Sequence, residues 1–500
     1  MKGICYLTGA GPGNPGLVTL KAQRCISQAD VLVYDALSSA ELLTWTKDSC
    51  EKIDVGKRAK CHKMKQEEIN QLLVDKVREG KVVVRLKGGD PMIFGRGGEE
   101  AAVLAEAGLK FEIIPGISSA FAGPTYAGIP LTHRDYGAQL TLFSGHEAEG
   151  KEKGDVDYEA LAKTPGTKIF LMGVARLAII SERLIGHGMD PETPIALTRW
   201  ATTGRQKTIT GTLSNISDIA EKQKFKAPAV GVIGNIIKEM DKIKWHENRP
   251  LQGKSIVVTR SQEQASGLVN KLTSLGADVL ELPVLKIVDP DNKREFAELV
   301  ANAHTYDWLV FSSTNGVRRF FDGFFSIYKD ARSIGGVKIA VVGPGTQQAV
   351  ESYRFSADLI PEKHVAEGLV EAFKNEQDIE NQTVLWVRPK NARSVLKDGL
   401  EEQRGIVDEC IAYSIEAEKD DPTGAAERFK SKGADLITFT SSSTAQYFYD
   451  LGLSWPEGCQ AASIGPVTTA KLKELGQNDI VEAEDHNIEG LVEAIVKTLS

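Results

Sequence analysis

Short runs rich in Val, Ile and Leu recur along the whole chain of 500 residues, separated by longer helical patterns. They include VLVYD, KVVVRLKGGD, KIFLMGV and PAVGVIG in the first half, and SIVVTR, DWLVFSS, KIAVVGP, TVLWVRP and DLITFTSS in the second. Because these runs do not alternate apolar with polar residues, they indicate strands of sheets covered on both faces by helices. The pattern predicts an α/β fold throughout, and the length predicts roughly three to four folding units.

The composition is that of an ordinary globular chain, with 42% apolar and 26% charged residues. No apolar run approaches the ~18 residues of a membrane span, and the opening MKGICYLTGAG leads into a strand rather than a signal sequence. The six cysteines show neither CxxC nor zinc-type spacing. We therefore expect a cytoplasmic protein with reduced thiols, no bound metal and no membrane association.

Charge is distributed unevenly between the two halves of the chain. The net charge is +4 over residues 1–250 and −12 over residues 251–500, which together give −8. An acidic half without a basic tract argues against nucleic acid as a partner, because phosphate neutralisation dominates that kind of affinity. The mildly basic half could still attract a small polyanion.

A polar stretch separates the halves. KEMDKIKWHENRPLQGKS contains a proline and a glycine and is followed by the apolar run SIVVTR. Such a stretch is typical of a linker, which we place at residues 246–252.

The second half contains an internal repeat. VVTR, which ends at Arg260, recurs as LWVR, which ends at Arg388, and DWLVFSST recurs as DLITFTSS at the same offset of 128. VVGPG recurs as SIGPV, and HVAEGLVEA recurs as HNIEGLVEA, both at an offset of 122. Four matched segments in the same order predict two similar α/β lobes, with a ligand in the cleft between them. A chance likeness between two doubly wound domains is the alternative.

Two glycine-rich loops follow strands of the first half. The loop GAGPGNPG allows a ligand to approach bare backbone, and VRLKGGDP places Gly88, Gly89 and Asp90 at a strand end, where open α/β sheets bind ligands. The first loop fits a nicotinamide dinucleotide poorly, because Asn14 stands where a third glycine is wanted and Pro12 lacks an N–H. A tight turn without a ligand is the alternative for both loops.

Basic residues near these loops are candidate contacts for substrate carboxylates. Arg134, which follows the Gly- and Pro-rich stretch at 115–132, and the Lys57-Arg58 pair could serve in this way. An isolated cation is, however, more often a solvated surface charge.

Taken together, the motifs of residues 1 to about 245 resemble the uroporphyrinogen-III C-methyltransferases of the tetrapyrrole methylase family. The resemblance rests on GAGPGNPGLVTLKA, VLVYDALS, VGKR, VRLKGGDPMIFGRGGEE, PGISSA, YAGIPLTHRDY, SGH, FLMGV and APAVGVIG, in that order. It implies two α/β subdomains, at about 1–115 and 116–245. It also implies S-adenosylmethionine as methyl donor and uroporphyrinogen III as a substrate that is methylated twice to precorrin-2.

The resemblance also implies site residues. Asp35 would be the proton acceptor and Lys57 the proton donor. The cofactor would be bound by Pro12, Gly88, Gly89, Asp90, Ile93, Ser118, Ser119, Met172 and Ala201. Asn14 and Ser118 depart from the family's usual aspartate and threonine. A strand-end cap is the alternative role for Asp35.

Hydroxyl-bearing residues follow the repeated strands of the second half. Such residues at helix N-termini could bind carboxylates, although helix capping also explains them. The candidates for substrate binding, together with Arg134, are Ser312, Ser313, Thr346, Ser441 and Ser442.

Residues 250–500 resemble uroporphyrinogen-III synthase, a family with two flavodoxin-like lobes. The resemblance implies that the domain spans 253–500, with one lobe at about 253–287 plus 414–500 and the other at about 288–413. It further implies that hydroxymethylbilane loses water and is closed to uroporphyrinogen III with inversion of ring D. Tyr413 matches the tyrosine proposed to assist the loss of water; a packing role is its alternative.

The sequence therefore predicts a bifunctional enzyme of tetrapyrrole biosynthesis, on the route to sirohaem or cobalamin. The alternatives are a nicotinamide-dependent oxidoreductase, or a second half that only binds a ligand. Small tetrapyrroles are the expected partners, and resemblance alone suggests a homodimer through the methyltransferase half.

Overall fold

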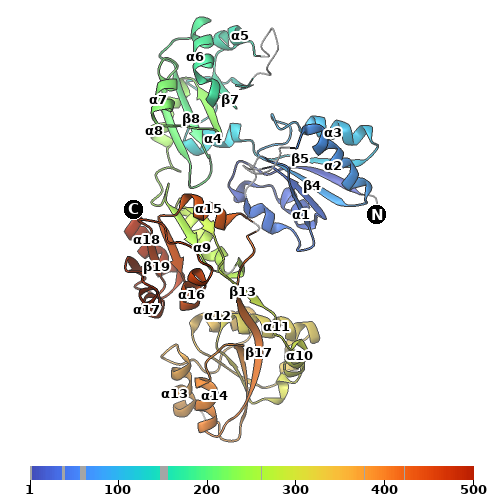
Figure 1. The fold of residues 1–500 in the computed structure, drawn as a ribbon, viewed down its shortest axis with the longest axis vertical. Helices are drawn as coiled ribbons and strands as arrows, with labels where there is room; N and C mark the ends of the chain where they lie inside the picture. Colours follow the sequence, from blue (N-terminus) through green and yellow to red (C-terminus); the bar gives the residue numbers. More distant parts are fainter. Residues whose placement is uncertain are drawn as a thin grey trace. The chain divides into compact units, whose positions relative to one another are not determined.

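The computed structural model describes residues 3–35, 40–56, 64–146, 156–260, 262–376, 378–421 and 423–500 (Figure 1). The chain divides into two compact units. The first comprises Met1–Thr259, Gln264–Leu282 and Asp420–Ser500, and the second comprises Arg260–Glu263 and Pro283–Lys419. Their residues form four five-stranded sheets with helices on their faces, which confirms the predicted α/β fold.

The first sheet of the first unit is entirely parallel, with strand order β3-β2-β4-β1-β5. Neighbouring residues of β4 face opposite sides, so Val83 packs against α2 and α3 while Val84 packs against α1 and η2. Burial on both faces explains why these strands are apolar without alternation. The elements are β1 (Ile4–Gly9), η1 (Pro15–Leu17), α1 (Leu20–Gln28), β2 (Val31–Tyr34), η2 (Ala40–Trp45), β3 (Glu51–Asp54), α2 (Gln66–Arg78), β4 (Val82–Lys87), α3 (Gly97–Glu106) and β5 (Lys110–Ile114).

The second sheet is mixed, with strand order β6-β7-β10-β8-β9. Phe170 of β7 packs against α5 and α6 on one face, and its neighbour Ile169 packs against α4 and η4 on the other. The elements are α4 (Ser119–Ala127), β6 (Leu140–Ser144), α5 (Tyr158–Lys163), β7 (Thr167–Leu171), η3 (Val174–Arg176), α6 (Leu177–Gly186), β8 (Pro194–Arg199), β9 (Lys207–Thr212), α7 (Ile216–Lys222), β10 (Ala229–Ile233), η4 (Asn235–Glu239) and α8 (Met240–Ile243).

The third sheet, also in the first unit, joins strands far apart in the sequence in the parallel order β12-β11-β18-β19-β20. Ile256 and Leu436 pack with α9 and α18 on one face. The elements are β11 (Ser255–Val258), α9 (Gln262–Ser274), β12 (Asp278–Glu281), α15 (Ala425–Lys432), β18 (Leu436–Phe439), α16 (Ser442–Asp450), β19 (Gln460–Ser463), α17 (Pro466–Glu474), β20 (Ile480–Glu482) and α18 (Ile488–Leu499).

The fourth sheet forms the core of the second unit, in the order β13-β17-β16-β14-β15, with only β13 antiparallel to its neighbour. Phe311 of β14 packs on a row of phenylalanines from α11, and Trp308 packs on the opposite face against α13. The elements are β13 (Leu285–Val288), α10 (Lys293–Ala301), η5 (Ala303–Thr305), β14 (Trp308–Phe311), α11 (Thr314–Ile327), η6 (Ala331–Ile334), β15 (Lys338–Val341), α12 (Pro344–Ser352), α13 (Ala366–Glu376), β16 (Thr383–Pro389), α14 (Val395–Glu402) and β17 (Ile406–Ala417).

The repeated segments of the sequence adopt matching local structures in these two sheets. A Cβ atom added to Gly343 would lie 3.1 Å from the His364 side chain, and one added to Gly465 would lie 3.1 Å from that of His486. The histidine of each repeat thus packs on the glycine of the same repeat, where a larger residue would crowd the ring.

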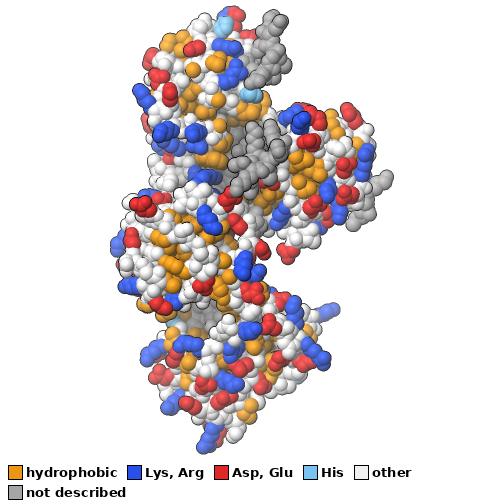
Figure 2. Space-filling model, viewed as in Figure 1, with side chains coloured by type: hydrophobic (Ala, Val, Ile, Leu, Met, Phe, Trp, Pro, Cys, Tyr) orange, Lys and Arg blue, Asp and Glu red, His pale blue; other side chains and the backbone are white. Residues whose placement is uncertain are grey.

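Within the described residues, no helix is both long and apolar enough to span a bilayer. Figure 2 shows Lys and Arg side chains mixed with Asp and Glu side chains over the visible face. Charges of both signs are therefore interspersed on that face rather than segregated.

Candidate active sites

Four glycines bring the ends of β1 and β4 together with the segment after β5. Gly11 and Gly89 form an isolated bridge, in which the Gly89 N–H donates to Gly11 O over 2.7 Å and the Gly11 N–H donates to Gly89 O over 3.2 Å. A Cβ atom on Gly116 would lie 2.3 Å from Gly89 O and 2.8 Å from the Cα of Gly9. Only bare backbone fits here, as expected where a chain approaches a ligand or another chain closely.

The Asp90 side chain links the second glycine loop by hydrogen bonds to the segment after β5. Its carboxylate accepts hydrogen bonds from the N–H of Met92 over 2.8 Å and from the N–H of Gly116 over 2.9 Å. Gly89 has a φ of +69°, and a Cβ atom there would lie 3.6 Å from the Cα of Ser118. The structure therefore brings Gly89 and Asp90 next to the start of α4.

Ser118 and Ser119 begin helix α4. Ser118 is only 3% exposed, and its hydroxyl accepts a hydrogen bond from the N–H of Ala120 over 3.3 Å as the N-cap. Ser119 is the first residue of the helix. Capping is thus one role of Ser118. The backbone nitrogen of Ser119 faces the second glycine loop, because a Cβ atom on Gly89 would lie 3.7 Å from it.

The loop containing Pro12 contacts the segment around Ala201. The Asn14 N–H donates to the hydroxyl of Thr202 over 3.0 Å, and a Cβ atom on Gly13 would lie 3.4 Å from Ala201 O. Trp200 and Thr202, which flank Ala201, have φ values of +49° and +70°. Positive φ is costly for such residues and clusters at functional sites. Sequence reasoning did not identify this strained turn.

Met172 and Ile93 are placed at loop positions. Met172 follows β7 with a φ of +58°, and its side chain is 51% exposed. Ile93 is half-buried in the turn after Asp90, where its N–H donates to Asp90 O over 3.4 Å.

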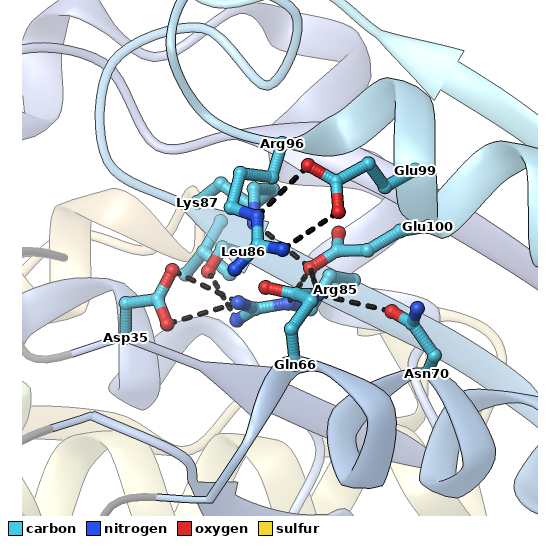
Figure 3. Close-up of polar contacts among 9 residues, drawn as sticks. All are labelled: Asp35, Gln66, Asn70, Arg85, Leu86, Lys87, Arg96, Glu99 and Glu100. Atoms are coloured by element: carbon cyan, nitrogen blue, oxygen red, sulfur yellow. Dashed lines mark hydrogen bonds and ion pairs between the residues drawn. The ribbon is translucent and has the colours of Figure 1, made fainter. Parts of the chain in front are cut away.

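Asp35 lies at the end of β2 beside a buried cluster of charges (Figure 3). Arg85 is 2% exposed, and its Nη2 donates to both carboxylate oxygens of Asp35 over 2.9 and 3.0 Å. The Nε of Arg85 donates to Oε1 of Glu100 over 3.2 Å, and Nζ of Lys87 donates to the same oxygen over 2.9 Å. We call Asp35, Arg85, Lys87 and Glu100 the charge cluster.

Glu100 compensates the buried cations of the charge cluster. Its side chain is fully buried, Oε1 also accepts from Gln66 over 3.1 Å, and Oε2 has no hydrogen-bond partner among the described residues. Burial and the charge of Arg85 lower the pKa of the Lys87 ammonium, while Glu100 opposes this shift. Sequence reasoning missed this cluster, although VVVRLK carries two cations two residues apart, hence on one face of an apolar strand.

Two basic candidates have different outcomes. Lys57, the predicted proton donor, lies outside the described residues. Arg134 is exposed and lies within a turn closed by hydrogen bonds between the backbones of His133 and Gly137.

Tyr413 is buried in the second unit, at 3% exposure. Its hydroxyl lies 3.0 Å from Oγ of Ser313, and burial raises the pKa of the phenol. Ser313 also caps α11, because its Oγ accepts from the N–H of Gly316 over 3.1 Å. Ser312 accepts from the indole of Trp386 over 3.4 Å, and Thr346 is buried in the first turn of α12.

Ser441 and Ser442 belong to the first unit. The Ser441 hydroxyl caps α16 by accepting from the N–H of Thr444 over 3.2 Å, and Ser442 begins that helix. The repeat thus places an N-cap serine after β14 and another after β18.

Comparisons with known proteins match the two halves of the sequence to two different families. Residues 5–217 match the family of Tetrapyrrole (Corrin/Porphyrin) Methylases, and residues 266–493 match Uroporphyrinogen-III synthase HemD. A porphyrin biosynthesis protein HemD of Ruminiclostridium josui is 35% identical over 99% of this chain and 98% of its own length. A uroporphyrinogen-III C-methyltransferase of Bacillus subtilis is 37% identical over 76% of this chain and 78% of its own.

The first half also has a relative of its own size. An S-adenosyl-L-methionine-dependent uroporphyrinogen III methyltransferase of Methanosarcina barkeri is 51% identical over 47% of this chain and 92% of its own length. The chain therefore belongs to the tetrapyrrole methylase family over its first half and to the uroporphyrinogen-III synthase family over its second.

Proposed function

We propose that the chain catalyses two consecutive steps of tetrapyrrole biosynthesis. The synthase part, at 253–500, closes hydroxymethylbilane to uroporphyrinogen III, with loss of water and inversion of ring D. The methyltransferase part, at 1–245, then methylates this product twice to precorrin-2, on the route to sirohaem or cobalamin. The observation that carries the methyltransferase assignment is the close approach of four bare glycines at strand ends, in a chain that belongs to this family.

The residues around the glycine loops fit S-adenosylmethionine. Gly89 and the glycines on either side of Pro12 leave the space that a Cβ atom would fill, and Ser118 and Ser119 supply N–H groups at a helix start. Gly88 precedes Gly89 in the same loop and is a further proposed contact. Asp90, Ile93, Met172 and Ala201 complete the proposed contacts. When bound, this donor supplies a methyl group on a cationic sulfur, so the protein mainly has to hold an electron-rich carbon in line with it.

Asp35 is proposed to accept the proton that the methylated pyrrole must lose. The Asp35 side chain is 32% exposed, so the carboxylate can face the substrate while it stays hydrogen-bonded to Arg85. A fixed carboxylate loses little orientational freedom in the transition state, which favours proton transfer. Lys57 is proposed as the proton donor and Arg134 as a contact for substrate carboxylates.

Tyr413 is proposed to donate a proton to the hydroxyl group that leaves hydroxymethylbilane. The carbon–oxygen bond breaks, the pyrrole nitrogen supplies the electron pair, and the departing oxygen takes the phenolic proton to leave as water. The phenol is protonated at neutral pH, because its ordinary pKa is already near 10 and burial raises it further. Ser312, Ser313, Thr346, Ser441 and Ser442 are proposed to bind carboxylates of the substrate through hydroxyl and N–H groups.

The deciding experiment is a coupled assay that starts from hydroxymethylbilane, with and without S-adenosylmethionine. We expect uroporphyrinogen III without the donor and precorrin-2 with it. If only the type I ring forms, which closes without an enzyme and without inversion of ring D, the second half binds a ligand but does not catalyse the cyclisation. Binding of NADH but not of S-adenosylhomocysteine would instead favour an oxidoreductase. We also propose a homodimer through the methyltransferase half, and a mass of one chain by gel filtration would contradict it.

A further inference from the structure

A pocket in the second unit lies next to the tyrosine proposed for water loss. It has a volume of about 140 Å³ and is lined by Ile287, Asn315, Arg318, Arg319 and Asp322. Four of these residues come from α11, which Ser313 caps, and three of the four lie in its N-terminal half. The volume is several times that of one water molecule, roughly 30 Å³, so a short acidic side arm of a ligand can enter it.

Asn315 connects this pocket to Tyr413. The Tyr413 hydroxyl is hydrogen-bonded to both Ser313 and Asn315. One residue therefore lines the pocket and contacts the phenol. A group bound in the pocket would lie within reach of the chemistry assigned to Tyr413.

The charged residues of the pocket are not equally compensated. Arg319 pairs with Asp289 over 3.1 Å, whereas the Asp322 carboxylate accepts a hydrogen bond from the neutral hydroxyl of Tyr353 over 2.8 Å and keeps its negative charge. Arg318 forms no ion pair with any side chain that the structure describes, a set that leaves out the side chains of residues 261–264. Its guanidinium is thus the charge that a ligand carboxylate could neutralise.

A second guanidinium lies near Arg318. Burial and the positive charge of Arg318 together lower the pKa of Arg260, which belongs to the same unit. Two like charges in proximity cost free energy, and an anion beside them removes part of that cost. Guanidinium groups also match a carboxylate in planar, two-point geometry.

We propose that Arg318, with Asn315 beside it, binds one carboxylate of the linear tetrapyrrole substrate and so places the neighbouring pyrrole at Tyr413. This inference rests on the proposed synthase function and adds a specificity-determining site to it. The hydroxyl-bearing helix starts supply neutral donors, whereas Arg318 supplies the charged contact that prefers an acidic arm over a neutral one.

The test compares Arg318→Gln and Arg318→Lys with Arg332→Gln in the full chain. Arg332 is the matched control, because its side chain is 91% exposed and pairs with Asp330 in the same unit. For Arg318→Gln we expect KM for hydroxymethylbilane to rise roughly tenfold or more, the scale of one charge-assisted hydrogen bond, with kcat within about twofold. Arg318→Lys should recover part of the loss, and Arg332→Gln should behave as the unmodified chain.

Binding of uroporphyrin, measured by fluorescence quenching, supplies a readout independent of turnover, and Arg318→Gln should weaken it by a similar factor. Unchanged KM and unchanged uroporphyrin affinity in Arg318→Gln would overturn the inference while leaving the synthase assignment intact. If the unmodified chain forms no uroporphyrinogen III from hydroxymethylbilane, the proposed synthase function itself is wrong. If Arg318→Gln does not fold, an unaltered KM and affinity in Arg318→Lys, checked for folding by circular dichroism, would also overturn it.

Discussion

Arg85 directs one nitrogen, Nη2, to both carboxylate oxygens of Asp35, at 2.9 and 3.0 Å. The two residues are 50 positions apart and meet because β2 and β4 are neighbours in the first sheet. Arg85 is itself held by Glu100, so a partly exposed carboxylate is anchored to a fully buried one through a single guanidinium. The orientation of Asp35 thus depends, through Arg85, on Glu100, which is fully buried.

Replacing Asp35 by Asn should lower the rate of methyl transfer by roughly 100-fold or more, the scale of general base catalysis. The amide keeps the size of the side chain but cannot accept the pyrrole proton. Initial rates with supplied uroporphyrinogen III measure this effect, and S-adenosylhomocysteine titration should give a Kd within a few-fold of the unmodified chain. Unaltered turnover would remove Asp35 from the reaction.

Replacing Glu100 by Gln should lower the free energy of unfolding by roughly 3–5 kcal/mol, because Lys87 would stay buried without a counter-charge and Arg85 would keep only Asp35. Urea denaturation measures this loss. Glu99→Gln is the matched control: the side chain of Glu99 is 54% exposed and pairs with Arg96 at the surface, so its removal should cost less than about 1 kcal/mol. Equal losses in both variants would contradict the coupling described for the charge cluster.

Gly116→Ala should destabilise the chain by about 1–3 kcal/mol and weaken S-adenosylhomocysteine binding, because the new methyl group would overlap Gly89 O and the Cα of Gly9. Thermal unfolding and calorimetric titration measure the two effects. Gly186→Ala is the control, since a Cβ atom there meets no other atom within 4 Å and the site lies at the end of helix α6. We expect that change to be neutral or slightly stabilising.

Tyr413→Phe should slow the formation of uroporphyrinogen III while leaving methylation of supplied uroporphyrinogen III unchanged. The ring is buried, so phenylalanine keeps the packing and removes only the hydroxyl that bonds to Ser313. A fall of at least about tenfold in kcat is expected for a lost proton donor. Parallel losses in both activities would point to misfolding instead.

His246 should make the fold sensitive to acid. Burial and the nearby charge of Arg249 lower its pKa from 6.5 to about 4, although a hydrogen bond to Thr203 and the charge of Glu247 oppose the shift. Between these two values the unfolded chain binds a proton that the folded chain does not. The stability contribution is therefore present above pH 6.5 and is lost as the pH falls towards 4, by at most about 3 kcal/mol.

His246→Gln removes this titration, so its unfolding free energy should change less between pH 7 and 4.5 than that of the unmodified chain. Urea denaturation at both pH values makes the comparison, because other groups titrate equally in the two proteins. The same pH dependence in both would show that His246 is not the group responsible.

Local patterns were sufficient to predict much of this protein. Continuous apolar runs indicated strands buried on both faces, since each residue of such a strand faces one of two helical layers, as Val83 and Val84 do. Glycines at strand ends marked close backbone approach, and serines before helices marked N-caps. The matched repeats of the second half identified two similar sheets.

Tertiary structure alone decided which charges meet. Period and composition do not specify the order of strands in a sheet, so the pairing of Asp35 with Arg85 and the anchoring of both on Glu100 could not be read from local patterns. The same holds for Arg318 near Arg260, which are 58 positions apart and come together only through the fold. Electrostatic interactions act through space, and distance in space follows from topology rather than from position along the chain.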